Sequence, residues 1–265
     1  MNSVEKQMVE VLSRCKENGA ISVKAEFEAE GTRMDELLRL VDVARAADLK
    51  LTVKIGGCEA IRDLLEAKQV GVDYIVAPMV ETPYALSKFV GAIAIAFNKD
   101  ERKHTEFLFN LETITAFDNL DEMIEVAVEG KIEGIVFGRV DFSGSLGIGR
   151  AGIESEEVTN KVIATALVAK KNGLDLVVGG AVSSDALPQL KRIYSEYLTR
   201  FETRKVVFAA NSLESDQIDK ALFNAVHFEL LWLLNKRSYY AQITAEDDKR
   251  IEMLESRWQV LSKQN

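Results

Sequence analysis

Short apolar runs alternate with helical stretches along most of this sequence. Several runs are apolar on consecutive residues, as strands covered on both faces must be. The segments between them space apolar residues by three and four, which is typical of helices that pack by one face. The runs occupy residues 21–28, 51–55, 73–78, 106–111, 134–138, 175–179 and 205–210. Strands that alternate with helices in this way predict a parallel sheet.

Helix start signals agree with this order of elements. Thr82 stands directly before Pro83, and Ser155 stands before two glutamates, so both are predicted N-caps. Thr32 is a third predicted N-cap, with Asp35 at the third helical position. Each of these helices therefore begins soon after a predicted strand.

The number of strands limits the choice of fold. A closed barrel needs eight strands and seven runs are visible, while a helix at about residues 4–17 precedes all of them. We predict an α/β fold, a TIM-like (β/α)8 parallel barrel over residues 1–212 with this N-terminal helix. Either one strand is cryptic, or the barrel is irregular and lacks a strand. Residues 201–205 are interpreted as a solvated connection between a helix and a strand, and the alternative is that they place charged groups near the active site.

Residues 213–265 are predicted to form a helical extension of the same domain unit. One helix is expected at about 215–237, apolar around most of its circumference. A second is expected at about 244–262, beginning at a Thr244 cap and carrying one apolar stripe. A helix on a barrel buries one stripe only, so we predict a homo-oligomer whose C-terminal helices contact, or are exchanged with, the neighbouring subunit near its barrel mouth. The alternative is a monomer whose last two helices cover each other.

Composition narrows the class of protein. The chain has 265 residues, of which 47% are hydrophobic and 28% charged, as in globular proteins with a sizeable core. The formal net charge of −9 excludes nucleic acid and anionic membranes as general partners. Neither a secretory leader nor a membrane span is recognisable, and Cys15 and Cys58 lack the spacing of a metal site. We therefore expect a cytoplasmic protein.

Candidate chemistry gathers where the predicted strands end, because active sites of parallel α/β folds form there. Glu28 follows the first run, and Lys54 lies at the end of the second. Glu112 and Asp141 follow consecutive runs, and if those strands pair, the two carboxylates are about 5 Å apart and can share one hard cation such as Mg²⁺. Alternatively, Glu112 caps the following helix and Asp141 caps its loop.

Glycines mark two further places. The segment from Gly138 to Gly152 also carries Arg139 and Arg150, and its backbone N–H groups are able to cradle a carboxylate or phosphate. A plain flexible loop is the equally weighted alternative. The pair Gly179-Gly180 at a strand end indicates a tight turn with a close backbone approach.

Four segments together resemble the HpcH/HpaI aldolase and citrate lyase beta-subunit family, in order and with compatible spacing from about residue 20 to about residue 210. They are Glu26-Phe27-Glu28, Ala77-Pro78-Met79-Val80-Glu81, Asn110-Leu111-Glu112-Thr113 and Gly138-Arg139-Val140-Asp141-Phe142-Ser143-Gly144-Ser145-Leu146-Gly147.

The resemblance implies a phosphoenolpyruvate/pyruvate-type barrel whose metal, usually Mg²⁺ and alternatively Mn²⁺, is held by Glu112 and Asp141. It also implies an arginine at the end of the second strand, where this chain has Lys54, which keeps the charge but loses the bidentate fork. Family aldolases carry a proton-transferring histidine directly after the first-strand glutamate. Here Glu28 is followed by Ala29, which marks a divergent member.

We therefore predict a metal-dependent carbon–carbon lyase or aldolase that acts on a small 2-keto acid, such as pyruvate, or a related acyl substrate through an enolate. Lys54 is the predicted catalytic residue and neutralises the anion. Backbone N–H groups of Arg139, Val140 and Asp141 are predicted to bind the substrate carboxylate, and Glu28 also contributes to substrate binding. Two alternatives stay open: a Schiff-base aldolase that uses Lys54, and a binding or scaffold protein that has lost catalysis, which Ala29 motivates.

Overall fold

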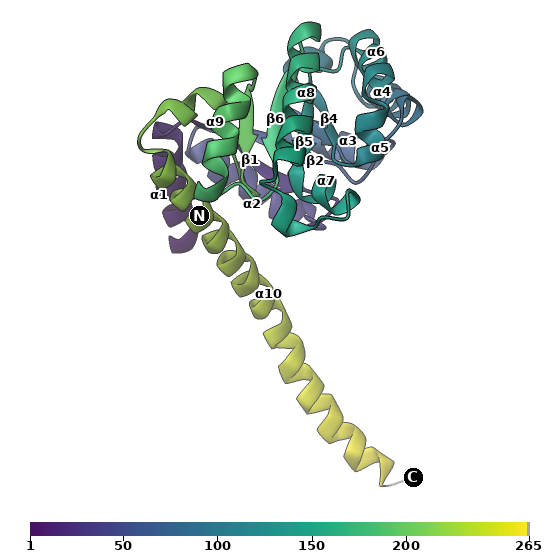
Figure 1. The fold of residues 1–265 in the computed structure, drawn as a ribbon. Helices are drawn as coiled ribbons and strands as arrows, with labels where there is room; N and C mark the ends of the chain where they lie inside the picture. The colour runs from purple at the N-terminus through teal and green to yellow at the C-terminus, as the bar shows by residue number, and fades with distance from the viewer. Residues whose placement is uncertain (264–265) are drawn as a thin grey trace.

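Eight strands close into a barrel in the order in which they occur along the chain (Figure 1). The fold is seen in a computed structural model that describes residues 1–263. The predicted TIM-like barrel is therefore confirmed. Its strands are β1 (Ala20–Glu26), β2 (Lys50–Lys54), β3 (Tyr74–Ala77), β4 (Glu106–Leu111), β5 (Gly134–Gly138), β6 (Asp175–Gly179), β7 (Arg200–Glu202) and β8 (Val206–Ala209).

The cryptic strand is β7, which overlaps the segment 201–205. The interpretation of this segment as a solvated connection is wrong, because Phe201, Glu202, Thr203 and Lys205 are buried. A strand of three residues is too short to show any periodicity in the sequence. The seven visible runs correspond to the other seven strands.

Strand β8 is antiparallel to both of its neighbours, β7 and β1, whereas all other neighbouring strands are parallel. The expectation of an entirely parallel sheet is wrong at this strand. Only residues 203–205 separate β7 from β8, and a parallel crossover needs a dozen residues or more. The short connection therefore reverses the chain and closes the barrel irregularly.

Ten helices accompany the strands in the described part of the chain. Thr82 and Ser155 cap α4 and α8 through their side chains, as predicted. The prediction for Thr32 is wrong, because α2 has Arg33 at its N-cap and the Glu36 carboxylate accepts its N–H. The helices are α1 (Ser3–Glu17), α2 (Met34–Ala46), α3 (Ile61–Val70), α4 (Pro83–Ala96), α5 (Ile114–Asp118), α6 (Leu120–Gly130), α7 (Arg139–Ser145), α8 (Glu156–Asn172), α9 (Leu187–Glu196) and α10 (Ile218–Ser262).

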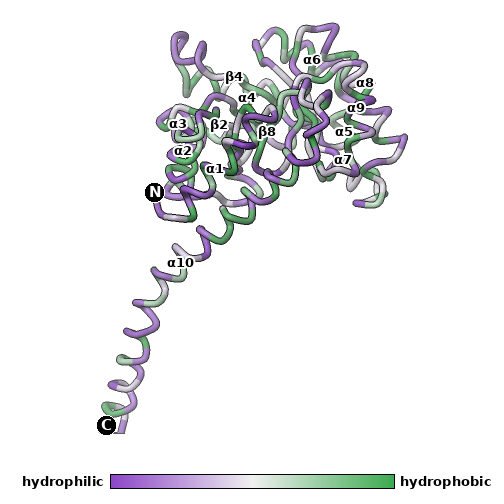
Figure 2. The backbone as a smooth tube through the Cα atoms, turned by 90° about the vertical axis from the view of Figure 1, so that its left-hand side faces the viewer, coloured by the Kyte–Doolittle hydropathy of each residue, from purple (hydrophilic) through white to green (hydrophobic). Residues whose placement is uncertain are grey.

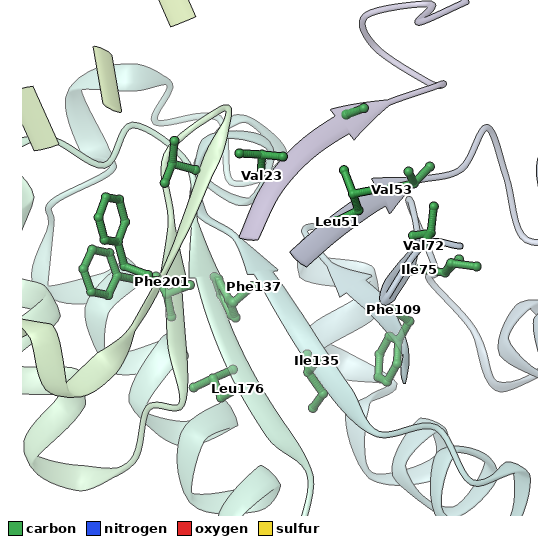
Figure 3. Packing of buried hydrophobic residues seen from close by; sticks show 14 of the residues in the cluster. Val23, Leu51, Val53, Val72, Ile75, Phe109, Ile135, Phe137, Leu176 and Phe201 are labelled. Atoms are coloured by element: carbon green, nitrogen blue, oxygen red, sulfur yellow. The ribbon is translucent and has the colours of Figure 1, made fainter. Parts of the chain in front are cut away.

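The main core lies between the barrel and the helices around it. Side chains such as Val53, Ile75 and Phe109 point outward from the strands into this layer (Figure 3). A smaller apolar cluster fills the barrel interior and consists of Tyr74, Val76, Leu108, Val136 and Val177. At the N-terminal ends of the strands, the Arg200 guanidinium pairs with Asp175 and Glu106. Because this end is filled, open space in the barrel lies at the opposite end.

The C-terminal extension is one helix of 45 residues and not two. Thr244 was expected to begin a new helix, but its hydroxyl donates to the backbone oxygens of Tyr240 and Ala241 inside α10. No glycine or proline interrupts the segment 218–262, so nothing in it ends a helix. Its distal half runs away from the barrel (Figure 1), and the alternative of two helices covering each other is not formed.

None of the helices in residues 1–263 combines the length and the apolar character that crossing a membrane requires.

Candidate active site

A cavity of about 490 Å³ opens at the C-terminal ends of the strands. Ten ionisable side chains line it. Six are acidic and four are basic, which gives the lining a net charge of −2 at neutral pH: Glu26, Glu28, Glu112, Asp141, Glu202 and Glu229 against Lys24, Lys54, Arg150 and Arg204. An anionic substrate alone is disfavoured in such a cavity, whereas a divalent cation balances the charge.

Lys54 ends β2 and is buried. Its ammonium nitrogen lies 3.1 Å from Glu28 Oε2 and 3.5 Å from Glu112 Oε2. The two carboxylates hold the ammonium group at the C-terminal end of the barrel, where it faces the cavity. This position suits neutralisation of negative charge on a bound ligand.

Glu112 follows β4 and is only 2% exposed. The Met79 N–H donates to its Oε1 at 2.9 Å, and the Asn110 amide donates to its Oε2 at 2.5 Å. Gly138 at the end of β5 leaves room for this carboxylate, because a Cβ there would lie 2.7 Å from Oε2. The suggestion that Glu112 caps the next helix is wrong, since the Thr113 hydroxyl accepts the N–H of Ala116 and caps α5.

Asp141 lies in the first turn of α7, directly after β5, which pairs with β4 as the predicted site requires. Its side chain is exposed and lines the cavity together with Val140 and Glu112. It makes no ion pair with any other residue of the described range 1–263. Asp141 thus offers a free carboxylate on the same cavity as Glu112.

Arg139 is also in α7, but its side chain turns away from the cavity. It is 1% exposed, and its Nη1 lies 3.0 Å from Oε1 and 2.9 Å from Oε2 of Glu154. The guanidinium also donates to the backbone oxygens of Gly179 and Gly180. The predicted substrate contact of Arg139 is therefore left to its backbone N–H.

The close backbone approach predicted at Gly179-Gly180 is present. A Cβ on Gly180 would lie 2.7 Å from the nitrogen of Val140, and the φ angle of this residue is +88°. Any other residue is strained there and collides with the start of α7. Gly180 thus allows β6 and α7 to meet at the cavity wall.

Lys24 is a buried cation of the cavity that the sequence interpretation overlooked. Its ammonium nitrogen lies 2.5 Å from Glu202 Oε1 and 3.2 Å from Glu26 Oε1. Burial lowers the pKa of Lys24, but the two carboxylates outweigh burial and the pKa is raised. The signal in the sequence was the alternation of Ser22, Lys24 and Glu26 along β1, which places all three on the inner face.

Asn110 supplies a buried acceptor with no donor. Its Oδ1 has no hydrogen-bond partner among the described residues, although the side chain is only 4% exposed and lines the cavity. A buried polar atom without a partner costs free energy. Asn110 is therefore suited to accept a hydrogen bond from a ligand or to face a cation.

The donor set fits a hard divalent cation. Glu112 and Asp141 supply carboxylate oxygens, Asn110 Oδ1 supplies an unpaired amide oxygen, and oxygen ligands are those that Mg²⁺ and Mn²⁺ prefer. Within residues 1–263, no group of three or more His, Cys, Asp or Glu side chains has the arrangement of a metal site. A cation here would thus rest on few protein ligands, which is common for Mg²⁺.

The fold and the cavity together define a class of protein, an α/β barrel with a charged pocket at the C-terminal ends of its strands. The model of the HpcH/HpaI aldolase/citrate lyase family matches residues 20–189. The chain belongs to this family. Family membership supports an enzyme of the carbon–carbon lyase type.

Solved structures show the same fold at low sequence identity. An HpcH/HpaI aldolase from Desulfitobacterium hafniense DCB-2 is 15% identical, with a TM-score of 0.59 over 74% of this chain and 82% of that chain. An HpcH/Hpal aldolase/citrate lyase family protein from Burkholderia cenocepacia J2315 is 13% identical, with a TM-score of 0.60 over 91% and 98%. The citrate synthase SbnG is 18% identical, with a TM-score of 0.59 over 74% and 81%. No curated protein sequence matches the chain.

Proposed function

We propose that this protein is a divalent-metal-dependent carbon–carbon lyase or aldolase that acts on a 2-keto acid or a related acyl substrate. The observation that carries the proposal is the oriented carboxylate of Glu112, fixed by the Met79 N–H and the Asn110 amide in a cavity with a net charge of −2. The family provides the type of reaction. The choice of Mg²⁺ or Mn²⁺ rests on the oxygen donors.

Glu112 and Asp141 would hold the cation at the junction of β4 and β5. When bound, the cation would supply a Lewis acid that withdraws electrons from the substrate during cleavage of the carbon–carbon bond. Its charge also admits an anionic substrate to the acidic cavity.

Lys54 neutralises negative charge that develops on a substrate oxygen. Glu28 holds the Lys54 ammonium in position through the 3.1 Å ion pair. Glu28 thereby contributes to substrate binding indirectly, through Lys54. Arg150 lines the cavity and makes no ion pair within residues 1–263, so it is a cation available to a substrate carboxylate. The backbone N–H groups of Val140 and Asp141 lie on the same wall.

Proton transfer falls to a carboxyl group of the cavity or to water, because Ala29 stands where family aldolases carry a histidine. Neither His104 nor His227 lines the cavity. Glu28 is the partly exposed acidic group next to Lys54, and it is the carboxyl group that we propose for this role.

The test is a titration of metal-free protein with Mg²⁺ or Mn²⁺ in the presence of pyruvate or oxaloacetate. The wild-type protein is expected to bind metal and ligand together, and Glu112→Ala is expected to lose metal binding. The matched control is Glu156→Ala, an exposed carboxylate outside the cavity. Absence of binding by the wild type, or equal binding by Glu112→Ala, contradicts the proposal.

The same samples distinguish the two alternatives. Binding of metal and ligand without turnover across a panel of 2-keto acids and acyl thioesters supports a binding protein that has lost catalysis. A borohydride-trapped adduct of pyruvate on Lys54 supports a Schiff-base aldolase.

A further inference from the structure

Helix α10 has two apolar faces in its proximal half, and only one of them is covered. One face packs on α1 and the barrel and contains Ile218, Ala221, Leu222, Ala225, Phe228, Leu231 and Trp232. The other face is open, although it also carries large apolar side chains: Phe223, Val226, Leu230 and Leu233, each more than half exposed. Figure 2 shows apolar positions continuing into the distal half of the helix, away from the barrel.

The open residues follow one seven-residue repeat over the length of α10. Phe223 and Leu230 share a heptad position with Ile251 and Trp258, whereas Val226 and Leu233 share the other core position with Leu254 and Leu261. We call these eight residues and the four between them in the same register, Arg237, Tyr240, Thr244 and Asp247, the open seam. A repeat of this kind is typical of helices that pair with another helix.

The proximal half of α10 is held firmly in place. The Tyr240 hydroxyl donates to Glu36 at 2.6 Å, Lys236 donates to the same carboxylate at 3.0 Å, and Asn235 donates to Glu5 at 3.2 Å. Beyond Tyr240 every described residue is exposed. Helices in proteins gain most of their stability from packing of an apolar face, so the exposed apolar side chains of this segment indicate a missing partner.

We propose that the open seam pairs with the open seam of a second copy of this chain, antiparallel, about a two-fold axis beside Gln242. This axis places Phe223 opposite the partner's Leu261, and Val226 opposite the partner's Trp258. It also places Leu230 opposite the partner's Leu254, and Leu233 opposite the partner's Ile251. Every exposed apolar residue of the seam then faces another one, and each contact occurs twice, as two-fold symmetry requires.

The polar residues in the middle of the open seam determine the register and the relative direction of the two paired helices. The same axis places Arg237 opposite the partner's Asp247, so opposite charges meet twice within the core of the pair. Neither side chain has an ion pair within residues 1–263. A parallel pair would instead place Arg237 against the partner's Arg237 and Asp247 against the partner's Asp247.

The positions beside the seam agree with the same direction. Glu229 lies next to the partner's Arg257, and Ile243 meets the partner's Ile243 close to the axis. Lys236 comes near the partner's Arg250, but its charge is already paired with Glu36 in its own chain. Charge complementarity thus favours the antiparallel pair, with a second copy of this chain as the partner.

The pairing reaches the proposed active site. Val226 and Glu229 line the cavity of the barrel. The partner's Trp258 and Arg257 therefore come to lie at the rim of that cavity. Each barrel would be bordered by the distal helix of the other subunit, which extends the predicted contact near the barrel mouth to named residues.

The first experiment measures the mass of the full chain in solution by light scattering with size exclusion. A dimer is expected at micromolar concentration. Leu254→Asp introduces two charges into the seam of each dimer and is expected to weaken dimerisation at least about 100-fold. Met253→Asp is the matched control, because Met253 is 52% exposed and Leu254 49%, but Met253 lies off the seam. A wild-type species of one chain's mass, or equal effects of both variants, would overturn the proposal.

The second experiment tests the direction. Val226→Cys and Trp258→Cys in one chain are expected to give disulfides that join position 226 to position 258. Within one helix these positions are about 48 Å apart, so such a bond is intermolecular. Disulfides that join 226 to 226 and 258 to 258 instead would overturn the antiparallel arrangement.

The third experiment exchanges the seam charges. Arg237→Asp and Asp247→Arg are each expected to weaken the dimer at least about 10-fold, and the double variant is expected to restore it. Far-UV circular dichroism checks that each variant stays folded. Single variants that dimerise as well as the wild type would overturn the register. None of these readouts depends on metal binding or turnover, so they are independent of the proposed function.

Discussion

The ammonium nitrogen of Lys54 lies 3.5 Å from Oε2 of Glu112, the carboxylate that we propose as a cation ligand. A lysine at this place competes with a bound cation, because both interact with the same negative charge. It also supplies the positive charge that a substrate oxygen needs. Removal of the Lys54 charge should therefore strengthen metal binding and lower turnover.

We predict that Lys54→Met binds Mg²⁺ or Mn²⁺ about fivefold or more tightly than the wild type and loses at least about 100-fold in turnover. Isothermal titration with Mn²⁺ and an assay of oxaloacetate cleavage measure the two effects. Lys88→Met, at an exposed lysine that pairs with Glu59, is the control and should change neither. Weaker metal binding by Lys54→Met contradicts the competition.

Gly138 offers a steric test of the same carboxylate. A Cβ at this position would lie 2.7 Å from Glu112 Oε2 and 2.9 Å from its Cβ, while the backbone angle of Gly138 suits any residue. Gly138→Ala is therefore expected to displace Glu112 and to weaken Mn²⁺ binding at least about 10-fold, with a stability loss of about 1–3 kcal/mol.

The control for this substitution lies in the same segment. A Cβ on Gly144 meets nothing within 4 Å, so Gly144→Ala should keep metal binding and stability. Titration with Mn²⁺ and unfolding in urea compare the two variants. Equal metal affinities would show that Glu112 does not hold the cation.

The barrel was predictable because its strands are apolar on consecutive residues and its helices carry apolar residues at spacings of three and four. Strand β7 was not predicted because three residues are too few to show a hydrophobic periodicity. The antiparallel direction of β8 was not predicted because it follows from the short connection between β7 and β8. The continuity of α10 was not predicted because threonine is a common N-cap residue, and Thr244 was therefore interpreted as a helix start. The helix continues through Thr244 because no glycine or proline stops it.

The site was predictable where residues follow strand ends, which placed Lys54, Glu112 and Asp141 on one cavity. Side-chain direction was not predictable. Arg139 turns toward Glu154, and this pairing depends on how α7 packs against the following loop. Lys24 was overlooked because a lysine in the middle of a strand has no obvious role until the strand is known to face a barrel interior.

The buried pair of Lys24 and Glu26 links stability to acid pH. Burial raises the pKa of Glu26, but the ammonium groups of Lys24 and Lys54 outweigh burial, and the pKa is lowered from its usual 4.5. The ionised form therefore contributes stability that is fully present above pH 4.5 and is lost as the pH falls through the lower folded-state pKa.

We predict that Lys24→Met, which removes the only ion-pair partner of Glu202 in residues 1–263 and the nearest cation of Glu26, lowers the free energy of unfolding by about 3–5 kcal/mol at pH 7. The loss should be smaller at pH 4, because protonation removes the uncompensated charges. Urea unfolding at both pH values measures it, and Lys249→Met in the exposed half of α10 is the control. A loss that grows on acidification is inconsistent with this account.

At alkaline pH the buried thiol of Cys15 should determine part of the stability. Cys15 faces α10 from α1, and burial raises the pKa of its thiol to about 12 from 9.0. Above pH 9 the unfolded chain loses this proton while the folded chain keeps it, so the free energy of unfolding falls as the pH rises. Between pH 8 and pH 10.5 the wild type should lose about 2 kcal/mol more than Cys15→Ala, as measured by urea unfolding at each pH.

Cys15→Ala itself has a lower free energy of unfolding at pH 8 because of the cavity that it leaves, so the comparison rests on the slopes against pH. Parallel slopes for the two proteins would mean that the α1–α10 contact opens before the rest of the chain unfolds and lets the thiol ionise there.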